Sequence, residues 1–502
     1  MKISFRKPDF FVFLQISFAF FGEMCYTRCS CANARKNTEK HGKLAFCMEN
    51  KRFRMTHEPV ERLIAKLSVP TIISMLVTTF YNMADTYFVS LLDNTSITGA
   101  VGVVFSLMTV IQAFGFFFGH GSGNFISRAL GSGNTDEAER MASVGFFCAM
   151  IAGACITVLG LIFLRPLAYL LGSTDTIYPY AKEYLAYILL GAPYMCASLV
   201  LNNQLRFQGN AVFAMIGLTS GAVLNCVLDP LLILGLDMGI RGAAIATIVS
   251  QFVSFLLLWI GVARSDNLKI RLRNFKPNRH YLLAILNGGA PSLCRQGIAS
   301  LASICLNRAA GGFGDYAITA MSVCSRIMMF LNSSMIGFGQ GFQPGCGFNY
   351  GAQQYSRVRR AFWFCVRVSA VFLMIVSGVA FAFAPQLVAL FSSDPQVIDF
   401  GVPTLRYMAA VFPLNAWIVM CNMEMQTMGK AVRASFLAAA RQGFLFIPLI
   451  LILPHILGAV GVQITQMVSD ICTFLISIPL QISILKELRA PDGVLEESDA
   501  RL

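Results

Sequence analysis

Two aspartates lie inside segments of this chain that are apolar enough to cross a membrane. Asp85 stands in the run Tyr81-Asn82-Met83-Ala84-Asp85-Thr86, and Asp229 stands in Asn225-Cys226-Val227-Leu228-Asp229-Pro230. An ionised acid in hydrocarbon costs about 2.5–3.5 kcal/mol even on the lenient insertion scale. Two such residues are expected to meet in a polar pocket that handles cations or protons, and they therefore predict an ion-driven transporter.

Helix geometry indicates which other residues reach that pocket. Asn225 and Asp229 are four positions apart and share one helix face. At about 1.5 Å per residue, Asp85 and Thr247 reach a similar depth in the membrane. Carboxylate, amide and hydroxyl oxygens suit Na⁺ or a shared proton. The predicted coupling site, with Na⁺ as one candidate ligand, consists of Asp85, Asn225, Asp229 and Thr247, supported by Tyr81 and Asn82. The alternative is that the two acids only hydrogen-bond between helices.

The elements that must position these residues are membrane helices. Hydrophobic residues make up 56% of the 502 positions, charged residues make up 13%, and the mean hydropathy is +0.63. A soluble domain would carry about twice that charge. Apolar runs long enough to span a bilayer predict an all-α membrane protein. Its twelve spans are expected near 65–90, 97–119, 142–164, 178–201, 211–235, 241–262, 281–307, 316–339, 361–385, 397–420, 432–454 and 458–485.

Basic residues indicate how the spans are oriented. The net charge of +13 lies mainly in residues 1–54 and in loops, which indicates membrane topology rather than nucleic-acid binding. If the N-terminus is inside, most of the Lys and Arg after residue 54 fall in inner loops and the C-terminal tail, as the positive-inside rule requires. We expect a multi-pass protein of the cell's inner (plasma) membrane with both termini cytoplasmic.

The sequence divides into five regions. Residues 1–54 are basic and hold only a short aromatic run, which is compatible with a signal region or a weak anchor. We interpret them as a dispensable extension or an over-long start. The other regions are an N-lobe at 55–262, a basic cytoplasmic linker at 263–280, a C-lobe at 281–485 and a cytoplasmic tail at 486–502. The linker is expected to be solvated near anionic headgroups.

The two halves of the chain repeat. Gly119, Gly121, Gly123 and Gly133 match Gly337, Gly339, Gly341 and Gly351 at a shift of 218. Gly209-Asn-Ala-Val matches Gly429-Lys-Ala-Val at 220, Gly239-x-x-Gly242 matches Gly458-x-x-Gly461 at 219, and Pro70 matches Pro291 at 221. Six spans plus six predict two pseudo-symmetric bundles around a central cavity. The repeat carries Asp85 to Leu306 and Asp229 to Ile447 or Leu449, so coupling chemistry is expected in the first half only.

Polar residues of the second half suggest other roles. Arg441 and Asp470 are interpreted as an ion pair between the last two spans. Gln296, Asn307 and Gln340 are candidates for lining the substrate cavity. Some of the abundant Met and Phe side chains would give such a cavity a deformable surface suited to varied lipophilic ligands.

Several motifs resemble those of one transporter family. They are Pro70 with Tyr81-Asn-x-x-Asp85-Thr86, the stretch Gly121-Ser-Gly-Asn-Phe-Ile-Ser127-Arg128-Ala-Leu-Gly131, Asn225-x-x-Leu-Asp229-Pro230, Gly341-Phe-Gln343-Pro344 through Asn349-Tyr350-Gly351-Ala352, and Arg441-Gln442-Gly-x-x-x-Ile-Pro448. Over residues 60–490 the chain resembles the bacterial MATE (multidrug and toxic compound extrusion) transporters.

The resemblance implies an antiporter that exports drug-like, often cationic compounds against inward flow of H⁺ or Na⁺. It also implies that Asp85 is the coupling acid and that Asn225, Asp229 and Thr247 complete its pocket. One branch of the family has a further acid in the seventh span. This chain has none around Ile298 and Ala299, which argues against a cation site in the second half.

Other functions remain as alternatives. A flippase for lipid-linked saccharides would need several basic residues around the cavity, and Arg295, Arg326 and Arg406 keep that interpretation open. The five His form no HExxH and the chain has no Gly-x-x-x-x-Gly-Lys-Ser/Thr, so an enzyme or an ATP-driven pump is not expected. We expect small-molecule substrates, a lipid bilayer as surroundings, no nucleic-acid partner, no cofactor beyond the coupling ion, and a monomer.

Overall fold

The structure, a computed structural model, describes residues 40–90, 95–236, 238–264 and 268–493. The chain divides into two units, Met1–Glu49 and Asn50–Leu502. The first unit is described only from residue 40, where helix α2 (Lys40–His57) begins. The expectations for residues 1–54 therefore lie mostly outside the described residues. Everything below concerns the second unit.

The N-terminal half of this unit, which we call the N-lobe, consists of long helices. Asn134 starts one of them, because its Oδ1 accepts a hydrogen bond from the backbone N–H of Glu137 at 3.2 Å. Pro230 removes a backbone donor at the end of another, directly before a π-helical turn. The elements are α3 (Val60–Ser90), α4 (Thr95–Gly131), α5 (Thr135–Ile162), α6 (Leu164–Leu170), α7 (Tyr178–Phe207), α8 (Ala211–Pro230), η3 (Leu231–Gly235) and α9 (Gly239–Arg264).

The C-terminal half, which we call the C-lobe, repeats this series after the short helix η4 (Leu272–Asn274). Its first two helices are α10 (Arg279–Gly311) and α11 (Asp315–Gly351). The others are α12 (Tyr355–Ala382), α13 (Ala384–Ala389), α14 (Pro395–Val411), α15 (Leu414–Met428), α16 (Ala431–Ala439), η5 (Ala440–Phe444), α17 (Phe446–Leu457) and α18 (Ala459–Glu487).

The described helices account for the twelve predicted spans. Nine spans in the described chain are long and apolar enough to cross a membrane, and α14 with α15 makes a tenth that is bent by 56°. Helices α10 and α11 supply the other two with 33 and 37 residues, although they are less apolar. Both α4 and α11 continue about three turns beyond their predicted ends near 119 and 339.

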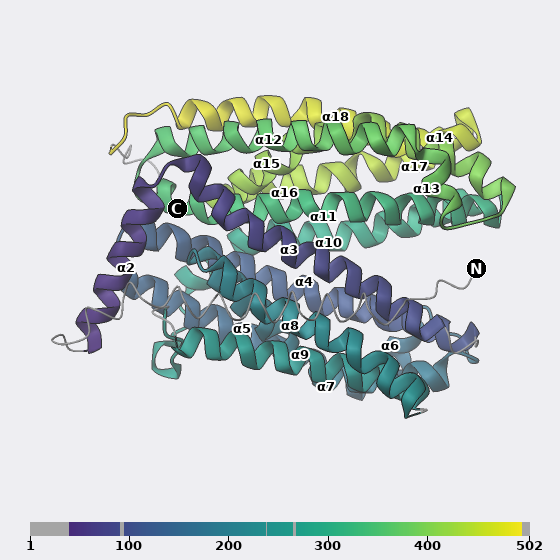
Figure 1. Cartoon of the computed structure of the whole chain (residues 1–502), viewed down its shortest axis with the longest axis horizontal. Coiled ribbons are helices and arrows are strands. Elements are labelled where there is room, and N and C mark those ends of the chain that lie inside the picture. The colour runs from purple at the N-terminus through teal and green to yellow at the C-terminus, as the bar shows by residue number, and fades with distance from the viewer. Residues whose placement is uncertain (1–39, 91–94, 237, 265–267, 494–502) are drawn as a thin grey trace, which may run out of the picture. The chain divides into compact units, whose positions relative to one another are not determined.

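The two lobes exchange their first helices. Helix α3 packs against α11 of the C-lobe as well as α8 of its own lobe, and α10 packs against α4 as well as α16. Figure 1 shows α3, in purple, running from the C-lobe helices toward those of the N-lobe. This exchange makes each lobe a bundle that cannot move without sliding against the first helix of the other.

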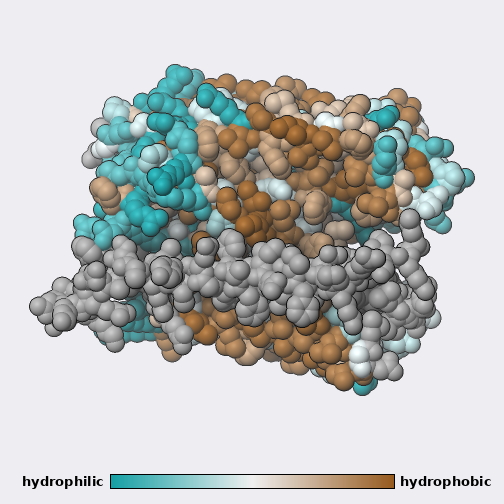
Figure 2. All heavy atoms as spheres, in the orientation of Figure 1, coloured by the Kyte–Doolittle hydropathy of each residue, from teal (hydrophilic) through white to brown (hydrophobic). Residues whose placement is uncertain are grey.

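Basic side chains gather at one end of the helices, which we call the basic end. Nη2 of Arg357 donates to the carbonyl oxygen of Glu58 there at 2.5 Å, and Nζ of Lys430 pairs with Glu487 at 3.0 Å. On the face drawn in Figure 2, a hydrophobic band crosses the middle and hydrophilic atoms lie at both ends. Such a band is what a membrane-spanning bundle requires.

Contacts in the structure set the internal repeat at 220 residues. Nδ2 of Asn202 donates to the carbonyl oxygen of Ala214 at 2.8 Å, and Nδ2 of Asn422 donates to that of Ala434 at 2.7 Å. Each of these residues lies 220 positions from its equivalent. The shift of 218 expected from the glycines is wrong, because alternate glycines in one helix can be matched two residues out of register.

The corrected register explains an unusual backbone conformation. Gly133 has φ 86°, and its equivalent is Gln353, which has φ 59° and is the one non-glycine residue with positive φ in the described part of the chain. The turn between the second and third spans of each lobe needs a left-handed residue. In the C-lobe this residue is a glutamine, a residue type that rarely adopts positive φ.

An equivalent pair of prolines has different consequences in the two lobes. Pro193 lies inside the continuous helix α7, whereas Pro413 lies at the 56° bend between α14 and α15. A Cβ at Gly153 would lie 2.6 Å from Cα of Pro193, so α5 supports α7 at that point. The residue equivalent to Gly153 is Leu373, whose side chain is fully buried and prevents the same close approach.

The linker between the lobes is partly docked on the N-lobe. The backbone N–H of Leu268 donates to Oε1 of Gln208 at 3.0 Å, and that of Arg271 donates to Oγ of Ser143 at 3.2 Å. Leu268 is completely buried. The expectation of a solvated linker is therefore wrong for its middle, since one apolar residue and three backbone donors, those of Leu268, Lys269 and Arg271, anchor it.

Candidate functional site

The predicted acidic pocket lies near the end of α8. Asn225 is 3% exposed and Asp229 is 0% exposed, and Nδ2 of Asn225 donates a hydrogen bond to Oδ1 of Asp229 at 3.2 Å. The shared helix face predicted from their spacing is confirmed. The π-helical turn η3 follows directly, and such turns are frequent at functional sites.

Thr247 faces this part of α8 from α9. The two helices run antiparallel: Gly217 meets Leu258 and Gly242 meets Leu232. Interpolating between these contacts places Thr247 opposite the turn of α8 between Asn225 and Asp229. Thr247 is 4% exposed and its hydroxyl donates to the carbonyl oxygen of Ala243 at 3.0 Å, so its oxygen lone pairs remain able to accept or ligate.

Asp85 lies on α3, but the side chains of residues 85–90 lie outside the described residues. Helix α3, which carries Asp85, packs against α8, which carries Asn225 and Asp229. Tyr81 is buried and Asn82 is half-buried one turn earlier. The meeting of Asp85 with Asp229 stays a prediction.

A cation in this pocket would need oxygen ligands. No cluster of three His, Cys, Asp or Glu residues in the described chain could hold a metal ion. The described groups near the pocket are the Asp229 carboxylate, the Asn225 amide oxygen and the Thr247 hydroxyl. The amide oxygen of Asn225 is buried and accepts no hydrogen bond from any described residue, which fits the donor set of a Na⁺ or proton site.

The C-lobe holds a different polar cluster on the equivalent pair of spans. Nε of Arg441 donates to Oδ1 of Asp470 at 2.8 Å, which confirms the predicted ion pair between the last two spans. Gln466 and Asn415 also donate to the Asp470 carboxylate, at 3.0 and 3.5 Å. Arg295 of α10 lies within electrostatic range of Arg441. Here the carboxylate is held by a guanidinium.

The three predicted cavity residues do not form one surface. Gln296 is half-buried and Asn307 is exposed. Gln340 is 4% exposed and accepts a hydrogen bond from Arg206. In this conformation a residue of the N-lobe covers Gln340, and the cavity role of all three residues stays a prediction.

The two lobes touch backbone to backbone at the basic end. A Cβ at Gly131 would lie 2.2 Å from the carbonyl oxygen of Phe348, and one at Gly351 would lie 2.1 Å from that of Arg128. By contrast, a Cβ added at Gly297 of α10 would meet no atom within 4 Å. The glycines that repeat in α4 and α11 thus allow close contact of the lobes rather than ligand binding.

A chain of buried polar side chains crosses this closed interface. His120 of α4 lies between Arg206 of α7, with Nε2 and Nη2 3.2 Å apart, and Ser292 of α10, with Nδ1 and Oγ 3.0 Å apart. Gln426 of α15 donates to the Ser292 hydroxyl at 2.8 Å. Arg206 also donates to Gln340 of α11. All five residues are at most 4% exposed.

The direction of these hydrogen bonds follows from chemistry. Arginine only donates, so Nε2 of His120 accepts and Nδ1 carries the proton that is donated to Ser292. No carboxylate in the described residues pairs with Arg206. Its charge is stabilised by amide oxygens and the imidazole, and of these acceptors the amide of Gln340 comes from the other lobe.

Sequence reasoning missed this chain of residues. From the sequence, Arg206 is only one of the basic residues assigned to the inner side, because it stands near the end of a span. One signal was available: Arg206 and Gln426 are equivalent in the 220-residue repeat, so both lobes place a polar side chain at the same helix end. A contact between lobes cannot be seen from either helix alone.

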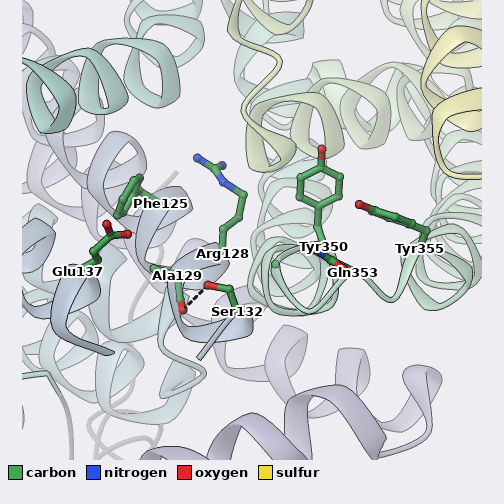
Figure 3. A pocket seen from close by; sticks show the side chains of 9 residues that line it. Phe125, Arg128, Ala129, Ser132, Glu137, Tyr350, Gln353 and Tyr355 are labelled. Carbon is green, nitrogen blue, oxygen red and sulfur yellow. Dashed lines mark hydrogen bonds between the residues drawn. The ribbon is translucent and has the colours of Figure 1, made fainter. Parts of the chain in front are cut away.

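A pocket of about 300 Å³ lies outside the closed interface at the basic end. Figure 3 shows it, with the Arg128 side chain between Phe125 and Tyr350 and with Glu137 to one side. Both lobes line the pocket, but none of the predicted coupling or cavity residues does. It is therefore distinct from the acidic pocket of α8.

Comparison with known proteins identifies the class. Residues 70–231 and 291–452 match the MatE family, one match in each lobe. A multidrug export protein MepA of Staphylococcus haemolyticus is 26% identical over 425 residues, which are 84% of this chain and 94% of that protein. The chain belongs to the MatE family of membrane transporters.

Solved structures agree with this assignment. A multidrug resistance MATE family transporter of the MOP superfamily in an outward-facing conformation has a TM-score of 0.81 and 27% identity, covering 91% of this chain and 100% of that chain. A MATE crystal structure in the straight conformation has a TM-score of 0.82 and 27% identity, covering 87% and 99%. The family is a class of multi-pass membrane transporters rather than a class of enzymes.

Proposed function

We propose that this protein exports drug-like compounds, chiefly lipophilic or cationic ones, in exchange for H⁺ or Na⁺ by alternating access. The similarity to MepA multidrug export proteins supports the substrate class. The observation that carries the coupling mechanism is the buried Asp229, held by the neutral amide of Asn225 with Thr247 across from it. A carboxylate among neutral oxygen groups can bind and release a cation or a proton.

We further propose that the basic end faces the cytoplasm. Positive charges concentrate there, as expected for the inner side of a bacterial membrane. The lobes are closed at that end, so this conformation would present its binding surfaces to the outer side. Labelling single introduced cysteines in the loops at each end, in intact cells, tests the orientation.

The proposed cycle uses the contacts between the lobes. Cation binding at Asp85 and Asp229 from outside would change the packing of α3, which is continuous through Pro70 here, and release the substrate. The interface at the basic end would then part to admit new substrate. One charge moving down 100 mV supplies about 2.3 kcal/mol. Because both lobes belong to one chain, we propose the monomer as the transporting unit.

The test is transport by the purified protein in vesicles. A pH gradient and a Na⁺ gradient are imposed separately, and efflux of a fluorescent lipophilic cation is followed. One gradient should drive uphill efflux, and Asp85→Asn should abolish it. Asp136→Asn, which changes an exposed acid in the first turn of α5, is the matched control. Coupled efflux that survives in Asp85→Asn would disprove the proposed site.

A lipid-linked saccharide flippase is the second candidate. The half-buried Arg295 near Arg441 favours it, since a pyrophosphate needs clustered positive charge. Arg406 instead stacks over the Phe381 ring at 5.5 Å, and no described contact joins it to Arg295. A lipid-flipping assay with the same vesicles separates the two functions.

A further inference from the structure

A second membrane-embedded acid lies in the C-lobe, outside the motifs that resemble those of the transporter family. Glu424 of α15 and Gln481 of α18 are both 0% exposed. Nε2 of Gln481 donates a hydrogen bond to Oε2 of Glu424. The other oxygens of the pair, Oε1 of Glu424 and Oε1 of Gln481, are buried and have no hydrogen-bond partner among the described residues.

The surroundings of Glu424 contain no compensating charge. Cys421 on the same helix, Cys346 of α11 and Cys365 of α12 lie close enough to interact with it electrostatically. Arg128 of α4 reaches α15, but it donates to the carbonyl oxygen of Thr427 at 2.5 Å. No Lys, Arg or His in the described chain forms an ion pair with Glu424. An ionised carboxylate buried without a cation costs several kcal/mol.

A single proton on Glu424 would give both unpartnered oxygens a hydrogen bond. If Oε1 of Glu424 carries hydrogen, the carboxyl becomes a donor as well as an acceptor. It can then donate to Oε1 of Gln481 while Oε2 accepts from Nε2. The acid and the amide would form a closed pair with two hydrogen bonds. Ionised, the same groups would place two unpartnered oxygens together in a buried space, at about 1–3 kcal/mol each.

The internal repeat gives an independent indication. The residue equivalent to Glu424 is Gln204, a neutral amide that is 1% exposed. Nε2 of Gln204 donates to Oγ of Ser122 at 3.1 Å and to the carbonyl oxygen of Ala142 at 3.0 Å. The N-lobe therefore fills this position with a neutral polar group. A protonated Glu424 is close to isosteric with that amide.

We infer that Glu424 is a proton-binding site of the C-lobe: it holds H⁺ in this conformation, pairs with Gln481, and so fixes the segment of α15 that closes the lobe interface. The next residues of that segment make the interface contacts, because Gln426 donates to Ser292 and Thr427 accepts from Arg128. This inference does not depend on the transport function proposed above. It adds a protonatable group to the half of the molecule that lacks the Asp85 and Asp229 pair.

Infrared difference spectroscopy of the purified full-length protein tests the inference. At neutral pH the wild type should show the C=O stretch of a protonated carboxyl, and Glu424→Gln should lose that band. Glu183→Gln is the control, because Glu183 is an exposed carboxylate paired with Arg241 at 2.6 Å and its change should leave the band intact. If Glu424→Gln removes no such band, the inference is overturned.

A second variant covers the case in which Glu424→Gln fails to fold. Gln481→Leu removes the partner but keeps the acid, so the band should move to higher frequency as the carbonyl loses its hydrogen bond. An absent band, or a band at an unchanged frequency, would contradict the pair.

Stability gives a further readout. At a pH below the ordinary pKa of a glutamic acid, Glu424→Gln should change the Tm little, because the side chain is then neutral in the folded and in the unfolded protein. As the pH rises above that value, the unfolded wild type loses the proton while the folded protein keeps it, so the stability of wild type should fall relative to that of Glu424→Gln until the folded protein also releases the proton. Parallel curves for the two proteins would contradict a bound proton.

Discussion

The two lobes use the same pair of helices for opposite electrostatic purposes. In the N-lobe, α8 and α9 bury Asp229 beside the neutral amide of Asn225. In the C-lobe, the equivalent spans bury Asp470 against the guanidinium of Arg441 at 2.8 Å. Each acid lies on or beside a span with a π-helical turn. The difference indicates that one repeat keeps a carboxylate whose charge can change, while the other keeps a locked ion pair that holds its helices together.

The lobes also differ in how they start their third spans. Asn134 caps α5 with its own side chain at 3.2 Å, whereas the equivalent Gln354 makes no side-chain cap of α12. The C-lobe instead uses Asp492 of the tail, which accepts from the backbone N–H of Ser356 at 3.0 Å. A duplicated fold has thus kept its geometry while changing the residues that stabilise it.

The largest effects are expected when the buried aspartate of each lobe is replaced by asparagine. The two replacements should separate ion coupling, which depends on the N-lobe acid, from stability, which depends on the C-lobe acid. Asp229→Asn should abolish ion-coupled efflux from vesicles and leave membrane insertion intact. Asp470→Asn should leave coupling intact but lower the free energy of unfolding by about 3 kcal/mol, because Arg441 keeps its charge without a counter-charge.

A double variant controls this comparison. Arg441→Met with Asp470→Leu removes both charges and should restore most of the stability lost in Asp470→Asn. If Asp470→Asn abolished coupled efflux at unchanged stability, the division of roles between the lobes would be wrong. Thermal unfolding in detergent and vesicle transport give the two measurements.

Adding a methyl group at the lobe interface should act on both lobes alike. Gly131→Ala and Gly351→Ala each place a Cβ near a backbone carbonyl oxygen of the other lobe, at 2.2 and 2.1 Å. Each should disfavour the closed basic end by about 1–3 kcal/mol. Hydrogen exchange of α10 amides near Ser292 should therefore speed up. Gly378→Ala in α12, where a Cβ also has no neighbour within 4 Å, should leave exchange of α10 unchanged, and equal rates in all three variants would contradict the proposed contact.

Removing the cap of α5 or the cap of α12 should lower the free energy of unfolding by similar amounts at neutral pH. The two losses should depend differently on pH. Asn134→Ala and Asp492→Asn should each destabilise by about 1 kcal/mol at neutral pH. Burial acts to raise the pKa of Asp492, but hydrogen bonds from Ser356 outweigh it and lower the pKa below its usual value. The contribution of Asp492 is therefore present above its unfolded-state pKa and disappears as the pH falls through its folded-state pKa. The cost of Asn134→Ala should not change, and unfolding curves across this acid range distinguish the two caps.

The smallest effect is expected at the left-handed turn residue. Gln353→Gly should raise the free energy of unfolding by about 0.5 kcal/mol, because relief of left-handed strain exceeds the added chain entropy. Gly133→Ala, at the equivalent N-lobe position with φ 86°, should destabilise instead. Chemical or thermal unfolding checks both, and a loss of stability in Gln353→Gly would show that its side chain matters more than its backbone.

Local features of the sequence were sufficient for much of the fold and part of the site. The twelve spans follow from apolar runs, the face shared by Asn225 and Asp229 follows from a four-residue spacing, and the ion pair of Arg441 with Asp470 follows from opposite charges in neighbouring spans. Each depends on one helix or on two that are joined by a short loop. The meeting of Asp85 with Asp229 and the choice of coupling ion stay predictions.

Features that depend on packing between distant helices could not be predicted in this way. The glycines of the second spans align two residues out of register, and neither the contact of Gln340 with Arg206 nor that of Glu424 with Gln481 can be read from the sequence. Arg206 and Gln340 lie 134 positions apart in the sequence, and Glu424 and Gln481 lie 57 apart. Nothing in either segment of a pair specifies which residue of the other segment it will face.

By itself, the sequence determined that this chain crosses a membrane repeatedly as two related halves and that its first half carries acids in apolar surroundings. Hydrophobicity and helical period are properties of contiguous residues, so they can be read along the chain. Only the tertiary structure decided which end of the lobes is closed, that His120 joins Arg206 to Ser292 across the interface, and that Glu424 is buried with an amide. Those facts depend on side chains from separate helices being brought within hydrogen-bond distance, and packing of the whole bundle is what brings them there.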